Sequence, residues 1–303
     1  AGGCLRDQDP AHRSNGTDTG KVLNRVITYV GDGYELEADQ RHSEMIVEQL
    51  GVTGSGGINL AGCENEEIET PEQERDLPAG DVTLFRGVAT RANYLGPDRP
   101  DMLYASKEVC REMSKPSVAG LDKITRIAKF LSGRPRVVWE FPNQESQDVI
   151  DVYVDANWAG CKTSRKSTSG GTVLWGSSVL KSYSKTQGTI AQSSAESELI
   201  AVVKSACEAI GTVSLADDLG IKLRVRLHVD AAAALGILER QGVGRVRHLD
   251  IGVLWLQEQQ LRRIVELTKV LGTSNPADLM TKHLAQEALN QYAEVLRYDF
   301  RQG

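Results

Sequence analysis

The chain has 303 residues, of which 40% are hydrophobic and 25% charged, an ordinary balance for one or two globular domains. Its apolar runs are short, so we expect no membrane span, and its five cysteines lack the CxxC spacing of zinc sites. A net charge of −6 would argue against nucleic-acid binding if the charge were evenly spread. It is uneven: residues 64–76 hold seven acids and one base, whereas residues 161–188 hold five bases and no acid.

The N-terminal part is predicted to hold a strand pair and one helix. Residues 1–20 are polar and rich in glycine, which predicts a disordered tail. β-Branched runs within 25–30 and 34–38 flank a glycine-rich turn and predict two short strands. Asp39 is a typical helix cap, so a helix should run from there to about Leu50.

A linker and a group of helices are predicted next. Residues 61–80 contain the acidic run and two prolines, which favours a linker. Helical patterns dominate the segment 81–147, at about 82–95, 102–113 and 116–133. A helical group this small has little core of its own, so we expect it to pack on the residues that follow.

From residue 148 the pattern changes to alternating strands and helices. Strands are expected at 150–155, 168–175, 179–184, 224–229 and 264–270. Helices are expected at 195–219, 231–239 and 249–262, with a last one opening at Asn275-Pro276. This order predicts an α/β domain over 148–286, built on a mixed sheet flanked by helices, and a C-terminal helix or tail over 287–303.

Four acidic residues fall where predicted strands end and helices begin. Asp155 and Asp230 end adjacent strands, Glu198 lies in the first turn of the long helix, and Asp278 lies in the first turn of the last one. Each alone is more often structural, because a helix dipole favours a carboxylate near its N-terminus. As a set of four they offer the hard oxygen ligands that a pair of Mg²⁺ ions needs.

These acids belong to six motifs, which are YVDANWAGC (153–161), RKSTSG (165–170), SSAESE (193–198), LHVD with AAL (227–235), RHLDI (247–251) and NPADLMTK (275–282). In this order they resemble the ribonuclease H domain of copia-type LTR retrotransposon Pol polyproteins. Upstream, ANYL with RPDM and then KFLSG are similar to the segment that joins polymerase to ribonuclease H in that family. The resemblance covers about residues 21–286, and it implies that 21–60 is a remnant of the C-terminal, thumb-like region of reverse transcriptase.

The resemblance implies a ribonuclease H-like five-stranded mixed sheet and an enzyme that hydrolyses the RNA strand of RNA–DNA hybrids. It implies two Mg²⁺ ions, with Mn²⁺ as an alternative, and a catalytic and metal-binding set of Asp155, Glu198, Asp230 and Asp278. Candidates for phosphate contacts are Lys162, Arg165, Lys166 and Lys185. The expected partners are the hybrid and the reverse-transcriptase domain of the same polyprotein, with no membrane. The expected location is a cytoplasmic retrotransposon particle, with the nucleus as the alternative.

Three positions depart from the family pattern. Asn157 stands where members often have a second aspartate, which leaves Asp155 as the sole candidate in that strand. Leu199 replaces a common tyrosine and keeps the position apolar. Alanines at 231 and 232 replace polar residues, which weakens the expected contacts to the nucleic-acid backbone.

Other interpretations stay open. Glu196 competes with Glu198, but its place favours a role in capping the helix. A DDE-type integrase would place its glutamate on the last helix, where this chain has Asp278. Ala156 removes the second aspartate that a polymerase YVDD motif needs. A non-catalytic, nucleic-acid-binding remnant of a decayed element is the main alternative, and the roles of His248 and Asp250 are undecided.

Overall fold

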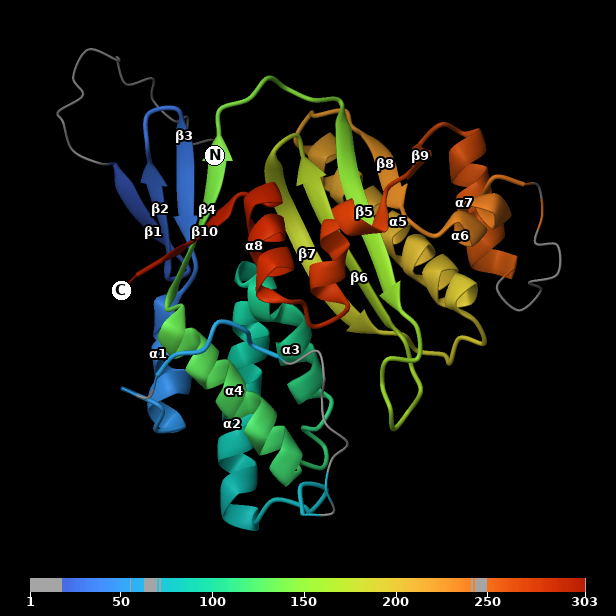
Figure 1. Cartoon of the computed structure of the whole chain (residues 1–303). Coiled ribbons are helices and arrows are strands. Elements are labelled where there is room, and N and C mark those ends of the chain that lie inside the picture. Colours follow the sequence, from blue (N-terminus) through green and yellow to red (C-terminus); the bar gives the residue numbers. More distant parts are fainter. Residues whose placement is uncertain are drawn as a thin grey trace, which may run out of the picture.

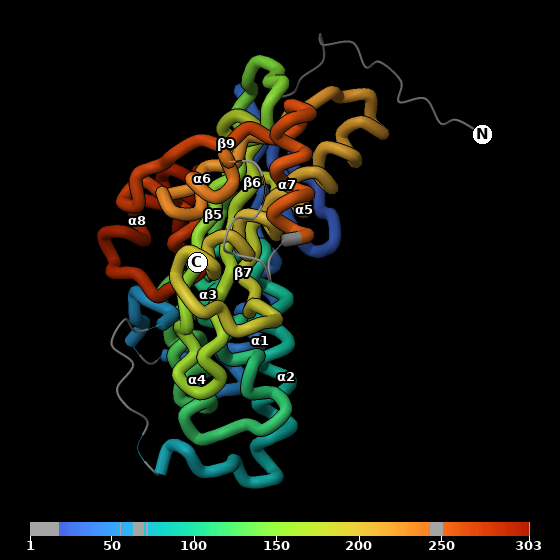
Figure 2. The backbone as a smooth tube through the Cα atoms, turned by 90° about the vertical axis from the view of Figure 1, so that its right-hand side faces the viewer, coloured from blue at the N-terminus to red at the C-terminus, as the bar shows by residue number. Residues whose placement is uncertain are grey.

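The computed structural model describes residues 18–54, 56–62, 70, 72–240, 242 and 250–302. Two five-stranded sheets lie next to each other, and a group of helices extends below them (Figure 1). After a quarter turn, helices α1, α2 and α4 still project away from the sheets (Figure 2). The chain builds four strands of the first sheet, then all of the second, and then returns to the first.

The first sheet is antiparallel throughout. Its strands, in spatial order, are β1 (Thr19–Val22), β2 (Arg25–Tyr29), β3 (Gly33–Glu37), β4 (Arg136–Pro142) and β10 (Tyr298–Arg301). The β2–β3 hairpin confirms the predicted strand pair. The predicted disordered tail over 1–20 extends too far into the chain, because Thr19 and Gly20 pair with β2. Residues 1–17 lie outside the described part of the chain. Neither β4 nor β10 was predicted.

Among the described residues between β3 and β4, the chain forms four α-helices and a short 3₁₀ helix. They are α1 (Gln40–Gln49), α2 (Ala79–Leu95), η1 (Gly96–Asp98), α3 (Pro100–Cys110) and α4 (Val118–Gly133). The side chain of Asp39 accepts a hydrogen bond from the backbone N–H of Arg41, as predicted for the cap of α1. The structure therefore confirms the helices expected in this segment, with boundaries that move by a few residues.

The helical group has a larger core than its length suggested. Ile46, Phe85, Ile124 and Phe130 are fully buried in one apolar cluster shared by α1, α2 and α4. Part of this core comes from α1, which joins the three predicted helices from an earlier part of the chain. They also pack on the following domain, as expected: Leu103 of α3 belongs to a cluster with residues of the second sheet.

The second sheet has the ribonuclease H-like order β7-β6-β5-β8-β9. Its strands are β5 (Val149–Asn157), β6 (Thr168–Trp175), β7 (Ser178–Thr186), β8 (Arg224–Val229) and β9 (Val265–Lys269). β5, β8 and β9 are parallel, and β6 and β7 run antiparallel to their neighbours. This mixed sheet confirms the predicted fold class.

Helices cover both faces of this sheet. One face packs against α5 (Ser194–Asp218), α6 (Ala232–Leu238) and α7 (Asp250–Leu261). By length and composition alone α5 could cross a membrane. Its apolar character is explained by packing, because Leu199, Val202 and Ala206 are buried against the strands.

The region around Asp278 differs from the prediction. The expected last helix is instead two elements: a 3₁₀ helix, η4 (Pro276–Met280), and, after a break, α8 (Gln286–Val295). Asp278 lies in η4, and α8 covers the sheet face opposite α5 (Figure 1). Local sequence did not reveal the break, because it is set by tertiary contacts of the residues after Met280.

Candidate metal centre

Two neighbouring parallel strands bring the first two carboxylates together. Val154 of β5 is paired with Val229 of β8, so the residues that follow them, Asp155 and Asp230, lie side by side near the same end of the sheet. One carboxylate oxygen from each of Asp155, Asp230 and Asp278 lies within 4.8 Å of the others. The structure therefore brings three of the four predicted ligands into one cluster.

Asp278 reaches the cluster because η4 crosses β6 at a glycine. A Cβ atom at Gly170 would lie 2.6 Å from the Thr281 side chain and 2.7 Å from that of Met280, so a larger residue would push this segment away. At the start of η4, Asn275 Nδ2 donates to the carbonyl oxygen of Val154 at 2.8 Å. The two contacts fix η4 against the strands that carry Asp155.

Asn157 and Thr281 position the central carboxylate. The hydroxyl of Thr281 donates to Oδ2 of Asp155. Asn157 Nδ2 in turn donates to the carbonyl oxygen of Thr281 at 3.2 Å. An ionised aspartate at position 157 could not donate this bond. The departure from the family pattern therefore has a structural role in this chain.

Glu198 lies beside the cluster. It is the fifth residue of α5 and so just beyond the first turn; the acid in that turn is Glu196. Glu196 accepts from the backbone N–H of Gln192 at 2.8 Å, and Ser193 Oγ accepts from the N–H of Glu196 at 3.2 Å, which is the capping role expected for Glu196. Glu198 is only 9% exposed, and no described residue donates to its Oε2.

The pKa values of the acids in this centre lie above those of free carboxyl groups. Burial first, and then the charges of Asp155 and Asp230, raise the pKa of Glu198 to about 9. Burial and repulsion between neighbouring carboxylates also raise the pKa values of Asp155, Asp230 and Asp278. A cation placed among these oxygens would relieve both effects.

Lys282 is a member of the centre that sequence reasoning did not single out. Its Nζ lies 2.7 Å from Oδ1 of Asp278. Burial opposes the charge of Lys282, but Asp155, Asp278 and Asp230 together raise its pKa. Lys282 and Thr281 end the NPADLMTK motif, and the four-residue spacing from Asp278 to Lys282 was the available signal for an ion pair.

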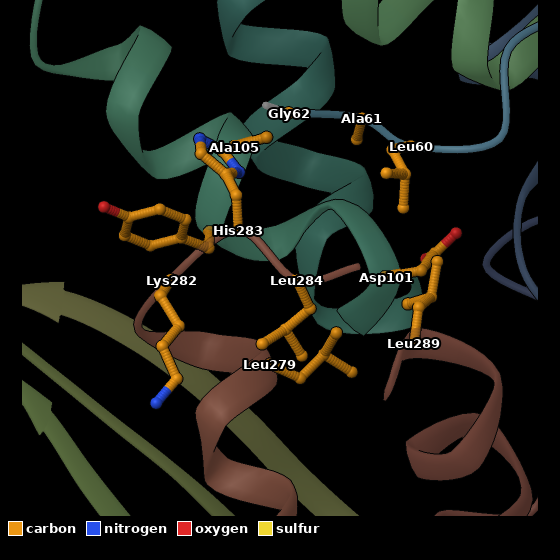
Figure 3. A pocket seen from close by; sticks show the side chains of 11 residues that line it. Leu60, Ala61, Gly62, Asp101, Ala105, Leu279, Lys282, His283, Leu284 and Leu289 are labelled. Carbon is orange, nitrogen blue, oxygen red and sulfur yellow. The ribbon is translucent and has the colours of Figure 1, made fainter. Parts of the chain in front are cut away.

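Residues after η4 fix this segment against helix α3. The rings of His283 and Tyr104 lie edge to face with their centroids 4.8 Å apart. Figure 3 shows His283 directed toward Gly62 and Ala105, whereas Lys282 points away from them. Gly62 is required here, because a Cβ atom would lie 1.9 Å from the His283 ring.

The donor set suits a hard divalent cation. All four candidate ligands are carboxylates. Three of them are clustered, and the fourth, Glu198, has an oxygen that accepts no hydrogen bond from the described residues. Oxygen-only sites favour Mg²⁺ or Mn²⁺, whereas zinc sites draw on His and Cys. These residues therefore fit Mg²⁺ and the Mn²⁺ alternative.

The four basic candidates divide into two groups. Lys162, Arg165 and Lys166 lie on the loop between β5 and β6, where the first two are exposed. Asp155 is paired across the sheet with Gly170, which is paired with Ser184. Lys185 of β7 is the next residue, and its side chain points to the opposite face from that of Ser184. It therefore lies on the α5 side of the sheet, opposite the face toward which Asp155 points.

The structure adds little on the RHLDI motif. His248 lies outside the described residues, and Asp250 is the first residue of α7, with no description of its side chain. Their roles stay undecided.

No protein-family model matches the sequence. The chain is 28% identical over 219 residues to a retrovirus-related Pol polyprotein from transposon RE1 of Arabidopsis thaliana, covering 71% of this chain and 15% of that polyprotein. It is 30% identical over 130 residues to the uncharacterized mitochondrial protein AtMg00810 of the same plant, covering 42% of this chain and 53% of that protein. Among solved structures, it is similar to LC11-RNase H1, isolated from compost by a metagenomic approach, with 13% identity, a TM-score of 0.37 and coverage of 48% of this chain and 98% of the other.

The matched part of the Pol polyproteins is therefore small: the chain spans about 15% of the length of the transposon RE1 protein. Further Pol polyproteins from transposons of Arabidopsis thaliana and Nicotiana tabacum match at 26% identity over 71% and 61% of the chain. Together with the ordered motifs, these matches make the chain similar to copia-type retrovirus-related Pol polyproteins over about 60–70% of its length.

Proposed function

We propose that this chain is the ribonuclease H part of a retrotransposon Pol polyprotein. It would act as a Mg²⁺-dependent endonuclease that hydrolyses the RNA strand of RNA–DNA hybrids during reverse transcription. The observation that carries the proposal is the approach of Asp155, Asp230 and Asp278 oxygens to within 4.8 Å of one another, beside the buried Glu198. The hybrid and the reverse-transcriptase domain would be its partners, in a cytoplasmic particle or in the nucleus.

The chain's own residues suit this chemistry. Bound Mg²⁺ ions would supply charge neutralisation and an activated water for phosphodiester hydrolysis. Asp155, at the centre of the cluster and oriented by Thr281, would be the ligand shared by both ions. Glu198 and Asp230 would complete one ion site and Asp278 the other. Selection of the hybrid would come from 2′-hydroxyl contacts and duplex shape rather than base sequence.

Cleavage of labelled duplexes tests the proposal. We expect cutting of the RNA strand of an RNA–DNA hybrid in Mg²⁺ and in Mn²⁺, no cutting in EDTA, and little cutting of duplex DNA. Equal cutting of hybrid and duplex DNA would contradict the substrate assignment. Hybrid binding with no cleavage in any divalent metal would instead support the alternative, a non-catalytic remnant of a decayed element.

A further inference from the structure

The loop between β5 and β6 carries three of the four basic residues assigned to phosphate contacts. It closes on itself: the N–H of Arg165 donates to the carbonyl oxygen of Cys161 at 2.8 Å, and the N–H of Cys161 donates to that of Lys166 at 3.2 Å. Ala159 and Arg165 have φ angles of 51° and 55°. Non-glycine residues keep such a left-handed backbone only where their surroundings hold it. The loop therefore needs support.

Helix α3 provides a contact to the middle of this loop. Arg111, which follows the helix, donates from Nη2 to Oγ of Ser164 at 3.0 Å. The same hydroxyl oxygen accepts the N–H of Lys166 at 3.4 Å, and the N–H of Ser164 lies 3.3 Å from Sγ of Cys161. Arg111 thus holds the side chain around which the loop turns.

This contact spans a space. A cavity of about 540 Å³ separates the end of α3 and the start of α4 from the loop, and Arg111, Lys162 and Ser164 are among the residues that line it. The loop and the helices flank this open pocket, and the hydrogen bond from Arg111 to Ser164 joins its two sides. Removing this hydrogen bond would release the loop while leaving the packed core intact.

Helix α3, which Arg111 follows directly, is held by contacts near both of its ends. At the start of α3, Arg99 and Asp101 form a buried ion pair, with Nη2 and Oδ2 2.7 Å apart. Further along, Lys107 Nζ donates to Oγ1 of Thr168 at 2.7 Å, at the first residue of β6. The helix is therefore tied to the sheet next to the loop that Arg111 contacts.

Arg111 is paired with Glu108, a carboxylate that it shares with Lys107. Its Nη1 lies 3.1 Å from Oε2 and 3.2 Å from Oε1 of Glu108. Lys162 and Arg165, by contrast, are exposed on the loop. This arrangement suits Arg111 to hold the loop and leaves the phosphate contacts to the loop residues.

We propose that Arg111 is a positioning residue for nucleic-acid binding: through Ser164 it fixes the β5–β6 loop so that Lys162, Arg165 and Lys166 meet the phosphate backbone. The helical segment before the ribonuclease H-like domain is then a working part of the nuclease. This inference rests on the proposed function, because it takes an RNA–DNA hybrid as the ligand.

The test measures hybrid binding over a range of salt concentrations, with Asp155→Asn present throughout so that the hybrid stays intact. Arg111→Gln and Ser164→Ala should each weaken binding about threefold to tenfold, as expected for loss of one ordinary intramolecular hydrogen bond. In a protein that also carries Lys162→Ala, Arg165→Ala and Lys166→Ala, the same two substitutions should have almost no further effect. Such coupling is the signature of residues that act as a unit.

Arg86→Gln is the matched control. Arg86, on α2, also donates from its guanidinium, to the carbonyl oxygens of Met113 and Ser114 at 2.8 and 3.3 Å, but it does not line the cavity beside the loop. Its loss should leave binding close to that of the parent. Thermal unfolding midpoints of all variants identify any that fail to fold, and Ser164→Ala keeps every charge.

The outcomes separate the two proposals. If Arg111→Gln weakens binding and Ser164→Ala does not, the proposed route through Ser164 is wrong. Effects that simply add to those of the loop substitutions would overturn it as well. If the parent protein neither binds nor cleaves the hybrid, the proposed function fails first, whatever the Arg111 variants do.

Discussion

The pKa values of the carboxylates on β3 of the first sheet and in the acidic cluster of the second are shifted in opposite directions. In the first sheet, each acid of β3 forms an ion pair with an arginine of another strand. Oε1 of Glu37 lies 2.6 Å from Nε of Arg136, and Oε1 of Glu35 lies 2.5 Å from Nη2 of Arg301. The arginine hydrogen bonds hold the pKa values of Glu35 and Glu37 below their ordinary range. Charge here is matched within the fold.

In the acidic cluster at the end of the second sheet, charge is left unmatched. Burial and mutual repulsion raise the pKa values of Asp155, Asp230, Asp278 and Glu198, and Lys282 is the cation in direct contact with them among the described residues. The comparison teaches that an acidic residue by itself says little about function. A surplus of buried carboxylates over cations is what marks a site built for a divalent ion.

The largest expected effect comes from removing the central ligand. Asp155→Asn should lower hybrid cleavage by at least about a hundredfold, because loss of a metal ligand removes several kcal/mol of transition-state stabilisation. Single-turnover cleavage rates check this. Asp151→Asn is the control: Asp151 lies on the same strand and bonds His228 at 2.7 Å, away from the cluster. Equal losses in both variants would mean that the metal site lies elsewhere.

The basic loop should give the next largest effect. Replacing Lys162, Arg165 and Lys166 together by alanine should weaken hybrid binding regardless of base sequence. The slope of log K against log salt should flatten by up to about 2.7, the contribution of three phosphate contacts. An unchanged slope would place the hybrid on another face, against the helical segment 91–136. The acidic run 64–76 lies partly outside the described residues, and we expect it to stay away from phosphate.

Lys282 should oppose metal binding to a smaller extent. Its ammonium competes with a divalent ion for Oδ1 of Asp278, so Lys282→Met should tighten Mn²⁺ binding about twofold to fivefold, the scale of a partly exposed ion pair. Calorimetric titration of Mn²⁺ measures this. Lys222→Met, which breaks a pair with Asp217 far from the site, should change nothing. Weaker binding in Lys282→Met would show that the lysine supports the site instead.

The smallest effects concern stability, and they should have opposite signs in the two sheets. Because the pKa of Glu198 rises from 4.5 to about 9 on folding, the folded state holds a proton that the unfolded state loses, and stability without metal falls as pH rises through that window. Glu198→Gln in EDTA should therefore raise Tm at pH 8 by roughly 2–4 °C, the shift given by about 1 kcal/mol in a protein of this size. The gain should vanish near pH 4.5.

Glu37→Gln should do the reverse. The pKa of Glu37 is lowered by Arg136, so its stabilisation is present above the ordinary value and is lost as pH falls through the lowered one. The substitution should lower Tm at pH 8 and matter less in acid. Equal responses of the two variants in pH-dependent thermal scans would remove the contrast between the sheets.

Local signals made much of the fold predictable. Asp39 caps α1 as expected, and the strand that carries Asp155 was visible from its alternation, although it continues to Asn157. β4 and β10 were missed because their partners are remote: Arg136 pairs with Arg301, and Trp139 pairs with Leu36. The residue pattern within either strand does not predict which strand it pairs with.

The candidate site was predictable as a residue set and less so as a geometry. The motifs pointed to Asp155, Glu198, Asp230 and Asp278, and three of these converge. Pro276 suggested that a helix would carry Asp278, but contacts of the next residues, such as Thr281 with Asp155, end that element as a 3₁₀ helix. The role of Asn157 could not be predicted, because its partner lies more than a hundred positions away.

The place of β10 has a consequence for synthesis. β4 pairs on one side with β3, which precedes it, and on the other with β10, which leaves the ribosome only after the entire second sheet has done so. Until then β4 is an open edge, and Trp139 lacks its contact with Tyr298, whose ring centroid lies 5.2 Å away in the finished protein. The second sheet can therefore be complete before β10 closes the first one.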